Sequence, residues 1–188
     1  MKKASLTIVL ILISVCLYAQ NLSWDINFLT GSEQTSTPIS QIIRMETGDV
    51  FQFSIKSDTD AFCYIICYDS KRDILVLHNG RLTGGGENLF GPFNVEDPSG
   101  AETIYIIMSL ENLPDLEGLI QNFNRAKTRQ STNSLYRAVV NLQNRVSRLG
   151  EPKSAFIPIG GTSRSSSQQY VTRFSGSSLY VRAITIRH

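Results

Sequence analysis

The chain contains two histidines, His78 and His188, and this small number limits its acid–base chemistry. A Ser-His-Asp or Cys-His pair needs a histidine beside its nucleophile, and a histidine-rich metal site needs several. No nucleophile-elbow, phosphate-loop or dinucleotide-binding motif is present. The sequence therefore argues against most classes of enzyme, and we expect no catalytic residues, no metal and no cofactor.

Cys63 and Cys67 are the two cysteines that could do redox or metal chemistry. Both lie in a segment with the composition of a β-strand, where four residues span about 13 Å. A disulfide needs Cα atoms within about 7 Å, so we expect no bridge between these two. A metal or redox role is the weaker alternative, because this spacing is not a known ligand spacing. We predict two buried, unpaired thiols.

Four aspartates, Asp58, Asp60, Asp69 and Asp73, cluster near the ends of predicted strands. Oxygen-rich turns can bind calcium, but no EF-hand spacing is present. Asp is also a common turn residue, because its side chain bonds nearby backbone. We therefore expect these residues to serve turns, and we expect the glycines at 84–86 to form an ordinary loop.

The charges are divided unevenly along the chain. Residues 21–117 hold 15 acids and 5 bases, whereas residues 118–188 hold 11 bases and one acid, Glu151. The favoured interpretation is that the two parts pack together and neutralise each other. The alternative is a surface for a polyanion or a partner. Its candidate residues are Arg125, Lys127, Arg129, Arg137, Arg145 and Arg148.

A nucleic-acid partner is not expected for this basic segment. Nucleic-acid surfaces pair basic side chains with exposed aromatics. Only Phe123 and Tyr136 are near, and both fit better in a core or at its rim. Anionic lipid headgroups or envelope polymers are the more suitable polyanions.

Most of the elements that position these residues are predicted strands. Alternating or continuous apolar residues predict strands at residues 24–29, 39–45, 50–56, 61–68, 74–78, 103–110, 170–174 and 179–187. Residues 61–68 are apolar on both faces, which is typical of a central strand, and residues 74–78 complete a hairpin with them. Residues 170–174 and 179–187 have the pattern of a closing hairpin.

Two sheets would then face each other across a common core. The apolar faces that we expect between the sheets are Phe51/Phe53/Ile55, Tyr64/Ile66 and Ile104/Ile106/Met108.

Two helices interrupt the predicted strands. Apolar residues recur at helical spacing over residues 114–124 and, more strongly, over residues 135–149. Residues 131–134 offer N-caps for the second helix, and Gly150 with Pro152 would end it. Residues 163–169 are rich in serine and have the composition of a mobile loop.

Residues 1–19 have the layout of a secretory signal peptide. Lys2 and Lys3 precede an apolar run over residues 6–17, and Ala19 is a small residue at the expected cleavage point. Lipidation of Cys16 is the alternative, but the preceding Val15 is bulky where a lipoprotein motif has a small residue. We expect the mature chain to begin near Gln20 and to work outside the cytoplasm, in the periplasm or secreted.

Several ordered motifs over residues 45–120 resemble a bacterial family known as domain of unknown function 4384. The segments that carry the resemblance are residues 48–53 (GDVFQF), 64–69 (YIICYD), 74–79 (ILVLHN) and 98–109 (PSGAETIYIIMS). The family usually ends the third segment with Phe-Pro-Asn, so His78 and the missing proline depart from its pattern. The resemblance implies an exported or accessory β-domain, and it carries no established catalytic residues.

These observations predict one mainly β, Ig-like or β-sandwich domain over residues 20–188, with one or two packed helices. Its family-like core would span residues 45–120, its basic helix residues 135–149 and its C-terminal strands residues 170–187. We expect an exported, non-catalytic module of the bacterial cell envelope whose partner is another envelope protein. The alternatives are a peripheral binder of anionic lipid or envelope polymer through residues 125–148, or an enzyme of unrecognised type.

Overall fold

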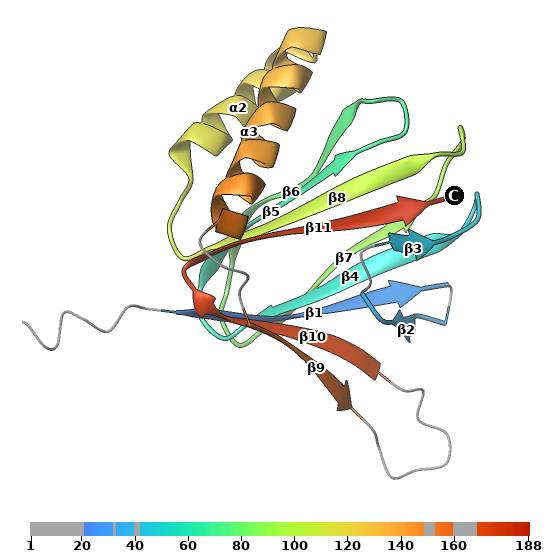
Figure 1. The fold of residues 1–188 in the computed structure, drawn as a ribbon, viewed down its shortest axis with the longest axis vertical. Helices are drawn as coiled ribbons and strands as arrows, with labels where there is room; N and C mark the ends of the chain where they lie inside the picture. Colours follow the sequence, from blue (N-terminus) through green and yellow to red (C-terminus); the bar gives the residue numbers. More distant parts are fainter. Residues whose placement is uncertain (1–20, 32, 40–41, 149–152, 160–168) are drawn as a thin grey trace, which may run out of the picture.

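The computed structural model describes residues 21–31, 33–39, 42–148, 153–159 and 169–188. These residues form two β-sheets and two helices (Figure 1). The predicted signal peptide, the predicted helix end at Gly150 and Pro152, and the serine-rich loop up to residue 168 lie outside the described residues. Gln169, which we assigned to that loop, begins a strand.

Each sheet mixes strands from the first and last parts of the sequence. The first sheet contains, in spatial order, β7 (Glu87–Asn94), β4 (Val50–Ser57), β1 (Leu22–Thr30), β10 (Gln169–Ser177) and β9 (Lys153–Ile159), with β2 (Thr35–Thr37) beside β1. The second contains β3 (Ile42–Arg44), β11 (Leu179–Arg187), β8 (Ala101–Ser109), β5 (Ala61–Tyr68) and β6 (Ile74–Leu82). The architecture is thus mainly β, as predicted.

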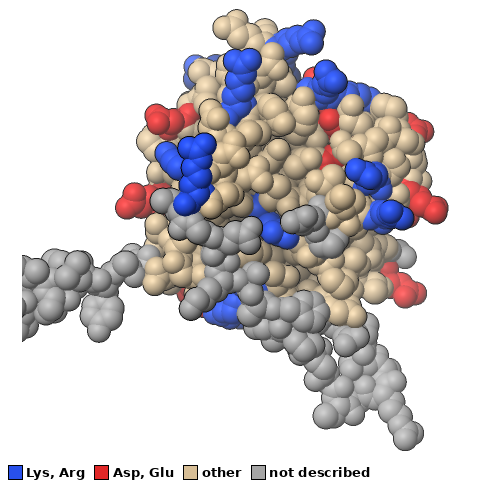
Figure 2. Space-filling view, viewed as in Figure 1, with Lys and Arg blue, Asp and Glu red and all other residues tan. Residues whose placement is uncertain are grey.

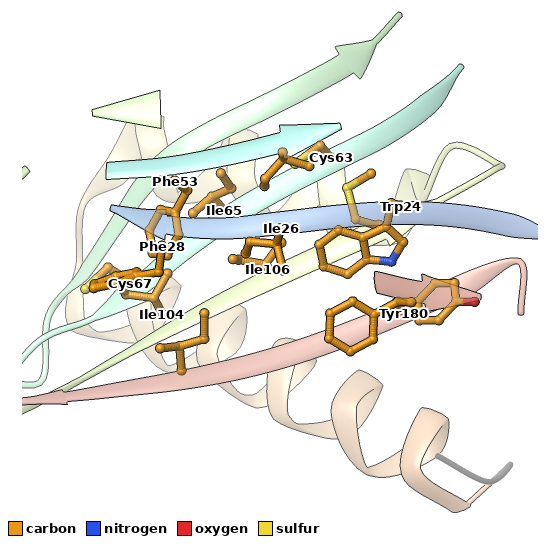
Figure 3. Packing of buried hydrophobic residues seen from close by; sticks show 14 of the residues in the cluster. Trp24, Ile26, Phe28, Phe53, Cys63, Ile65, Cys67, Ile104, Ile106 and Tyr180 are labelled. Atoms are coloured by element: carbon orange, nitrogen blue, oxygen red, sulfur yellow. The ribbon is translucent and has the colours of Figure 1, made fainter. Parts of the chain in front are cut away.

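The two sheets pack face to face over one apolar core. The alternating residues Phe51, Phe53 and Ile55 of β4 point into it, as their spacing predicted. Trp24 of β1 is fully buried there, and its ring stacks on Phe174 of β10 at 4.7 Å between centroids. Figure 3 shows this packing, in which each large buried side chain contributes about 1.5–3 kcal/mol.

A second apolar layer lies on the other face of the second sheet. The helices α2 (Pro114–Ala126) and α3 (Arg129–Arg148) cover that face (Figure 1). Because β5 is covered on both sides, its residues alternate between two buried layers. Cys63, Ile65 and Cys67 face the core between the sheets, whereas Tyr64 and Ile66 face the helices. Our assignment of Tyr64 and Ile66 to the core between the sheets was therefore wrong.

The last two strands do not form the hairpin that we predicted. β10 pairs with β1 and β9 in the first sheet, whereas β11 pairs with β8 and β3 in the second. The chain passes between the sheets at Ser178, after Gly176 has adopted a positive φ of 100°. The Tyr180 hydroxyl secures this crossing: it accepts from the Ser177 N–H at 2.9 Å and donates to the Leu22 carbonyl at 3.0 Å.

The helix α3 begins six residues before the predicted start at Leu135. Its cap is Thr128, and Ser131 lies three positions later in the first turn. The Ser131 N–H donates to Thr128 Oγ1 at 3.2 Å, and the Thr128 N–H donates to Ser131 Oγ at 3.0 Å. This reciprocal pair satisfies two backbone donors at the helix start, as in a capping box. The N-cap predicted within residues 131–134 was therefore wrong.

Candidate functional site

The six basic residues predicted as a partner surface all lie on the helical layer. Arg125 is in the last turn of α2, Lys127 follows that helix, and the other four belong to α3. All six side chains are exposed. Figure 2 shows Lys and Arg side chains over the helical layer in the upper part of the view. We call these six residues the basic surface.

The amphipathic pattern of α3 explains why its arginines face solvent. Leu135, Val139 and Val146 are buried on one side of the helix, so residues opposite them point outward. Arg129, Arg137 and Arg145 follow at intervals of eight residues, which is about 12 Å along the axis per step. Arg145 and Arg148 are three residues apart and are neighbours on the helix surface. The charge therefore extends along the whole helix.

No acid from the described part of the chain forms an ion pair with this surface, although Asp115 lines the same hollow as Arg145. The sequence of α3 contains no Asp or Glu, and none of the six basic residues forms an ion pair with a described acid. Glu151 is the single acid outside the described residues. We expected the acidic and basic parts of the chain to neutralise each other, and the basic surface is the part that stays without such a partner.

Neutralisation does occur elsewhere, through Arg173 on β10. This side chain pairs with Asp25 at 3.4 Å and also with Asp58. Neither Arg182 nor Arg187 of β11 forms an ion pair with a described acid. The two halves therefore join mainly through strand pairing and apolar packing.

The turn between the helices contains two basic residues at positions where the backbone conformation or the helix dipole favours other residue types. Lys127 has a φ of 45° and a ψ of 37°, a left-handed conformation that usually belongs to Gly or Asn after a helix. Arg129 is the first residue of α3, where the positive end of the helix dipole disfavours a cation. A Gly at the first position and an acid at the second would suit the local structure better.

Tyr64 fixes the other end of α2 to the sheet. Its hydroxyl accepts from the Leu113 N–H at 3.3 Å and donates to Glu117 Oε1 at 3.1 Å. Burial raises the pKa of Tyr64 to about 12, so the phenol keeps the proton that it donates. Because α2 has no side-chain N-cap of its own, this contact from the sheet orients the helix.

Among the described residues, hollows open on the helical layer, and the two that follow adjoin the basic surface. The first, of about 300 Å³, lies between α2 and α3, with Leu116, Leu119 and Leu142 in its wall and Asp115 and Arg145 beside them. The second, of about 360 Å³, lies by the turn between the helices and includes Arg125. Each hollow thus adjoins one residue of the basic surface.

The aromatic residues near the basic surface are packed, as predicted. Phe123 is buried in the layer between α2 and the sheet. Tyr136 is half-buried, and its ring stacks on Tyr68 of β5 at 4.2 Å between centroids. Both rings therefore take part in packing within the fold.

The cysteines and His78, whose side chains are of types that can do catalysis, are not part of the basic surface. Cys63 and Cys67 are buried and unpaired, which confirms the prediction. Burial raises the pKa of Cys67 to about 12 and raises the pKa of Cys63 as well, so neither is a ready thiolate. His78 packs against Phe90 at 4.8 Å between ring centroids, and burial lowers its pKa.

The other histidine, His188, lies beside the half-buried carboxyl group of Glu102. His188 Nε2 is 3.6 Å from Glu102 Oε1, and the His188 side chain is fully buried. Burial raises the pKa of Glu102 above its ordinary value of 4.5. Across the described residues, no three His, Cys, Asp or Glu side chains come together in a way that could hold a metal ion.

Two of the four aspartates predicted to serve turns, Asp69 and Asp60, bond nearby backbone through their side chains. Asp69 Oδ1 accepts from the Asp73 N–H at 2.7 Å, and Asp60 Oδ1 accepts from the Gly84 N–H at 2.8 Å. Asp60 also pairs with Arg81 at 2.9 Å. These bonds hold the turn between β5 and β6 and the loop after β6.

Comparison of the chain with protein-family models, with curated proteins and with solved structures gave no match. The resemblance to the domain of unknown function 4384 family stays a prediction that rests on the motifs. No helix in the described ranges is both long enough and apolar enough to cross a membrane.

One part of the candidate site was missed although its signal is present in the sequence. The order Thr-x-x-Ser at residues 128–131 is a variant of the capping-box pattern, with Ser131 where Glu or Gln is usual. It marks the start of α3 and therefore places Arg129 in the first helical turn. The left-handed conformation of Lys127 had no comparable signal, because Lys is rarely found there.

Proposed function

We propose that the protein is an exported, non-catalytic binding module of the cell envelope that uses the basic surface to bind an acidic surface on another envelope protein. One observation carries this proposal: six exposed cations extend over α2 and α3, and no described acid pairs with them. Such a field attracts an acidic partner and speeds its encounter.

Two of these residues occupy backbone positions that disfavour their residue types, and this loss of stability supports a role in binding. Lys127 and Arg129 each occupy a backbone position that another residue type would suit better. Positions where sequence and local structure disagree are expected at functional sites, because function and not stability selects the residue. Both residues lie in the same turn, beside Arg125.

Packing of α3 favours a polar contact over insertion into a membrane. Helices that lie in a membrane interface bury an apolar face among the lipids. The apolar face of α3 is already occupied, since Leu135 and Val139 pack against the sheet. Asn133, Asn141 and Asn144 are exposed on the outer side between the arginines, and they suit hydrogen bonds to a protein surface.

Anionic lipid headgroups or an envelope polymer form the second candidate partner. The observation in favour is the position of Arg137 and Arg148 on the outer side of α3, opposite its buried residues, where an anionic surface or polymer would contact both. Such binding would be purely electrostatic and would weaken steeply as salt increases. The partner class is therefore an outcome of the experiment below.

A photo-crosslinking amino acid at Asn141 tests the proposal in the cells that produce the protein. Asn141 is exposed on α3 between Arg137 and Arg145, and Ser99, which is exposed before β8, is the control position. We expect a protein adduct from position 141 and none of the same mass from position 99.

A charge variant tests whether that adduct depends on the basic surface. Combining Arg137→Gln, Arg145→Gln and Arg148→Gln should abolish it. The matched control replaces three exposed arginines outside the helical layer, Arg44, Arg72 and Arg187, by Gln and should leave the adduct unchanged. A lipid or polymer adduct moves the second candidate to first place, and an adduct insensitive to both variants contradicts the proposal.

A further inference from the structure

The outer strand β6 leaves an apolar residue exposed where the core should cover it. Leu75 of β6 lies opposite Cys67 of β5, so both side chains face the other sheet. Cys67 is 4% exposed, whereas Leu75 is 52% exposed. The first sheet therefore covers β5 at Cys67 but does not extend over the neighbouring part of β6 at Leu75.

A hollow of about 280 Å³ lies at this open side of the sandwich. Leu75, Leu77 and Ile104 line it from one sheet, and Phe51 and Phe93 line it from the other. An apolar cavity of roughly 150 Å³ can hold a benzene ring, so this hollow has room for a large apolar side chain. Farther along β6, His78 contacts Phe90 of β7, and the two sheets meet there.

Among the described strands, β6 pairs with β5 only, so no described strand covers its outer edge. Its nine residues contain neither Pro nor Lys, and its protection is limited to Arg81 and a bulge at Leu77. Proteins usually shorten an edge strand or place Pro or Lys in it, because an unpaired edge recruits other strands. The other sheet edges carry such protection: β3 has three residues, β7 contains Pro92 and β9 contains Lys153 and Pro158.

The rim of the hollow is acidic. Asp69, Glu96, Asp97 and Glu102 line it together with a single base, Lys71. A segment that places an apolar side chain in the hollow would bring its neighbouring side chains against these carboxylates. Charge complementarity thus selects a basic neighbour and disfavours an acidic one.

We propose that β6 accepts an extended segment of another polypeptide by strand addition, along residues 74–78. The segment would hydrogen-bond to the free edge, insert an apolar side chain beside Leu75 and direct a Lys or Arg to the acidic rim. Main-chain bonds supply affinity in this mode and the pocket supplies specificity. The site is distinct from the basic surface. The segment that binds to β6 is basic, whereas the partner proposed for the basic surface is acidic.

The test uses the whole mature protein and a synthetic peptide of about seven residues. The peptide alternates Thr with Val, carries one central Phe and has a Lys beside it. We expect binding that slows amide hydrogen exchange at residues 74–78, and we expect weaker binding when Glu replaces the Lys. Absence of binding at about 1 mM peptide, or protection elsewhere without protection of β6, overturns the proposal.

Two matched variants separate this site from unspecific binding. Leu75→Arg fills the hollow and adds a charge that repels the Lys, so it should weaken binding about tenfold or more. Leu89→Arg is the control, because Leu89 is 54% exposed on edge strand β7 and does not line the hollow. Equal effects of the two variants contradict the proposal.

A second copy of this chain is the other polypeptide that could pair with β6. Sedimentation of the free protein tests for it. We expect a monomer whose mass does not depend on concentration. A dimer that Leu75→Arg dissociates would show that β6 pairs with itself, and the proposed partner would then be wrong.

Discussion

Thr128 and Ser131 exchange hydrogen bonds in both directions at the start of α3. The pair fixes the point where the turn ends and the helix begins, between Lys127 and Arg129. It thereby holds two members of the basic surface at positions that neither residue type prefers. The capping pair and the surface charge can be tested separately, since the first affects folding and the second affects binding.

Thr128→Ala removes the acceptor that caps α3. We expect a loss of about 1 kcal/mol in the free energy of unfolding, because the Ser131 N–H then loses its partner. Urea denaturation of the two proteins measures this loss. Ser134→Ala, at an exposed site within the same helix, is the control and should change stability by less than about 0.5 kcal/mol. Equal effects would show that the capping pair does not stabilise the fold.

Arg129→Glu should raise stability and weaken partner binding at the same time. An acid in the first turn interacts favourably with the helix dipole, so we expect a gain of about 0.3–1 kcal/mol. Arg137→Glu lies in the middle of the helix and should weaken binding without that gain. Urea denaturation and the crosslinking yield from position 141 report the two effects. A loss of stability in Arg129→Glu would contradict our view that Arg129 costs stability.

Acid should destabilise the contact between His78 and Phe90. Burial lowers the pKa of His78 below its ordinary value of 6.5, so the unfolded chain binds the proton first as pH falls. This contribution to stability is therefore present above pH 6.5 and is lost as pH falls through the lower folded pKa.

His78→Leu isolates this effect, because the leucine has no proton to bind. The raised pKa values of Asp25 and Glu102 act in the opposite direction, but they are present in both proteins and cancel in the comparison. We expect the wild type to lose stability relative to the variant between pH 7.5 and pH 5, as measured in urea. A difference that stays constant with pH would refute this interpretation.

Truncation after Glu117 should prevent folding. It removes β10 and β9 from the first sheet, which leaves β1 without its partner on that side, and it removes β11 from between β3 and β8 in the second. β3 then loses its partner, and the Trp24 ring loses its stacking contact with Phe174. We expect an aggregating product without a cooperative thermal transition. A cooperative transition of residues 21–117 would show that the C-terminal part is a separate arm.

Local patterns were sufficient to predict the central strands. Period-two alternation identified Phe51, Phe53 and Ile55 as one buried face, and the continuous apolar run identified residues 61–68 as a strand covered on both sides. Strand β7 was missed, because Gly91 and Pro92 interrupt its apolar residues as they would in a loop.

Relations between distant strands could not be read from the same patterns. A short Ser-Gly-Ser-Ser link between two strands is common in hairpins, and nothing local shows that β10 and β11 join different sheets. The layer that Tyr64 faces depends on where the helices pack. The exposure of Leu75 depends on the reach of the opposite sheet, so the hollow beside it appears only in the folded structure.

The most direct test of the proposed function is retention of the purified mature protein on isolated envelope fractions at increasing NaCl. Screening shortens from about 10 Å at 0.1 M salt to about 3 Å at 1 M, so electrostatic retention should fall over this range. We predict that the variant combining Arg137→Gln, Arg145→Gln and Arg148→Gln is not retained even at low salt. The control with Arg44, Arg72 and Arg187 replaced by Gln should behave as wild type. Equal retention of both variants and the wild type, independent of salt, would contradict binding through the basic surface.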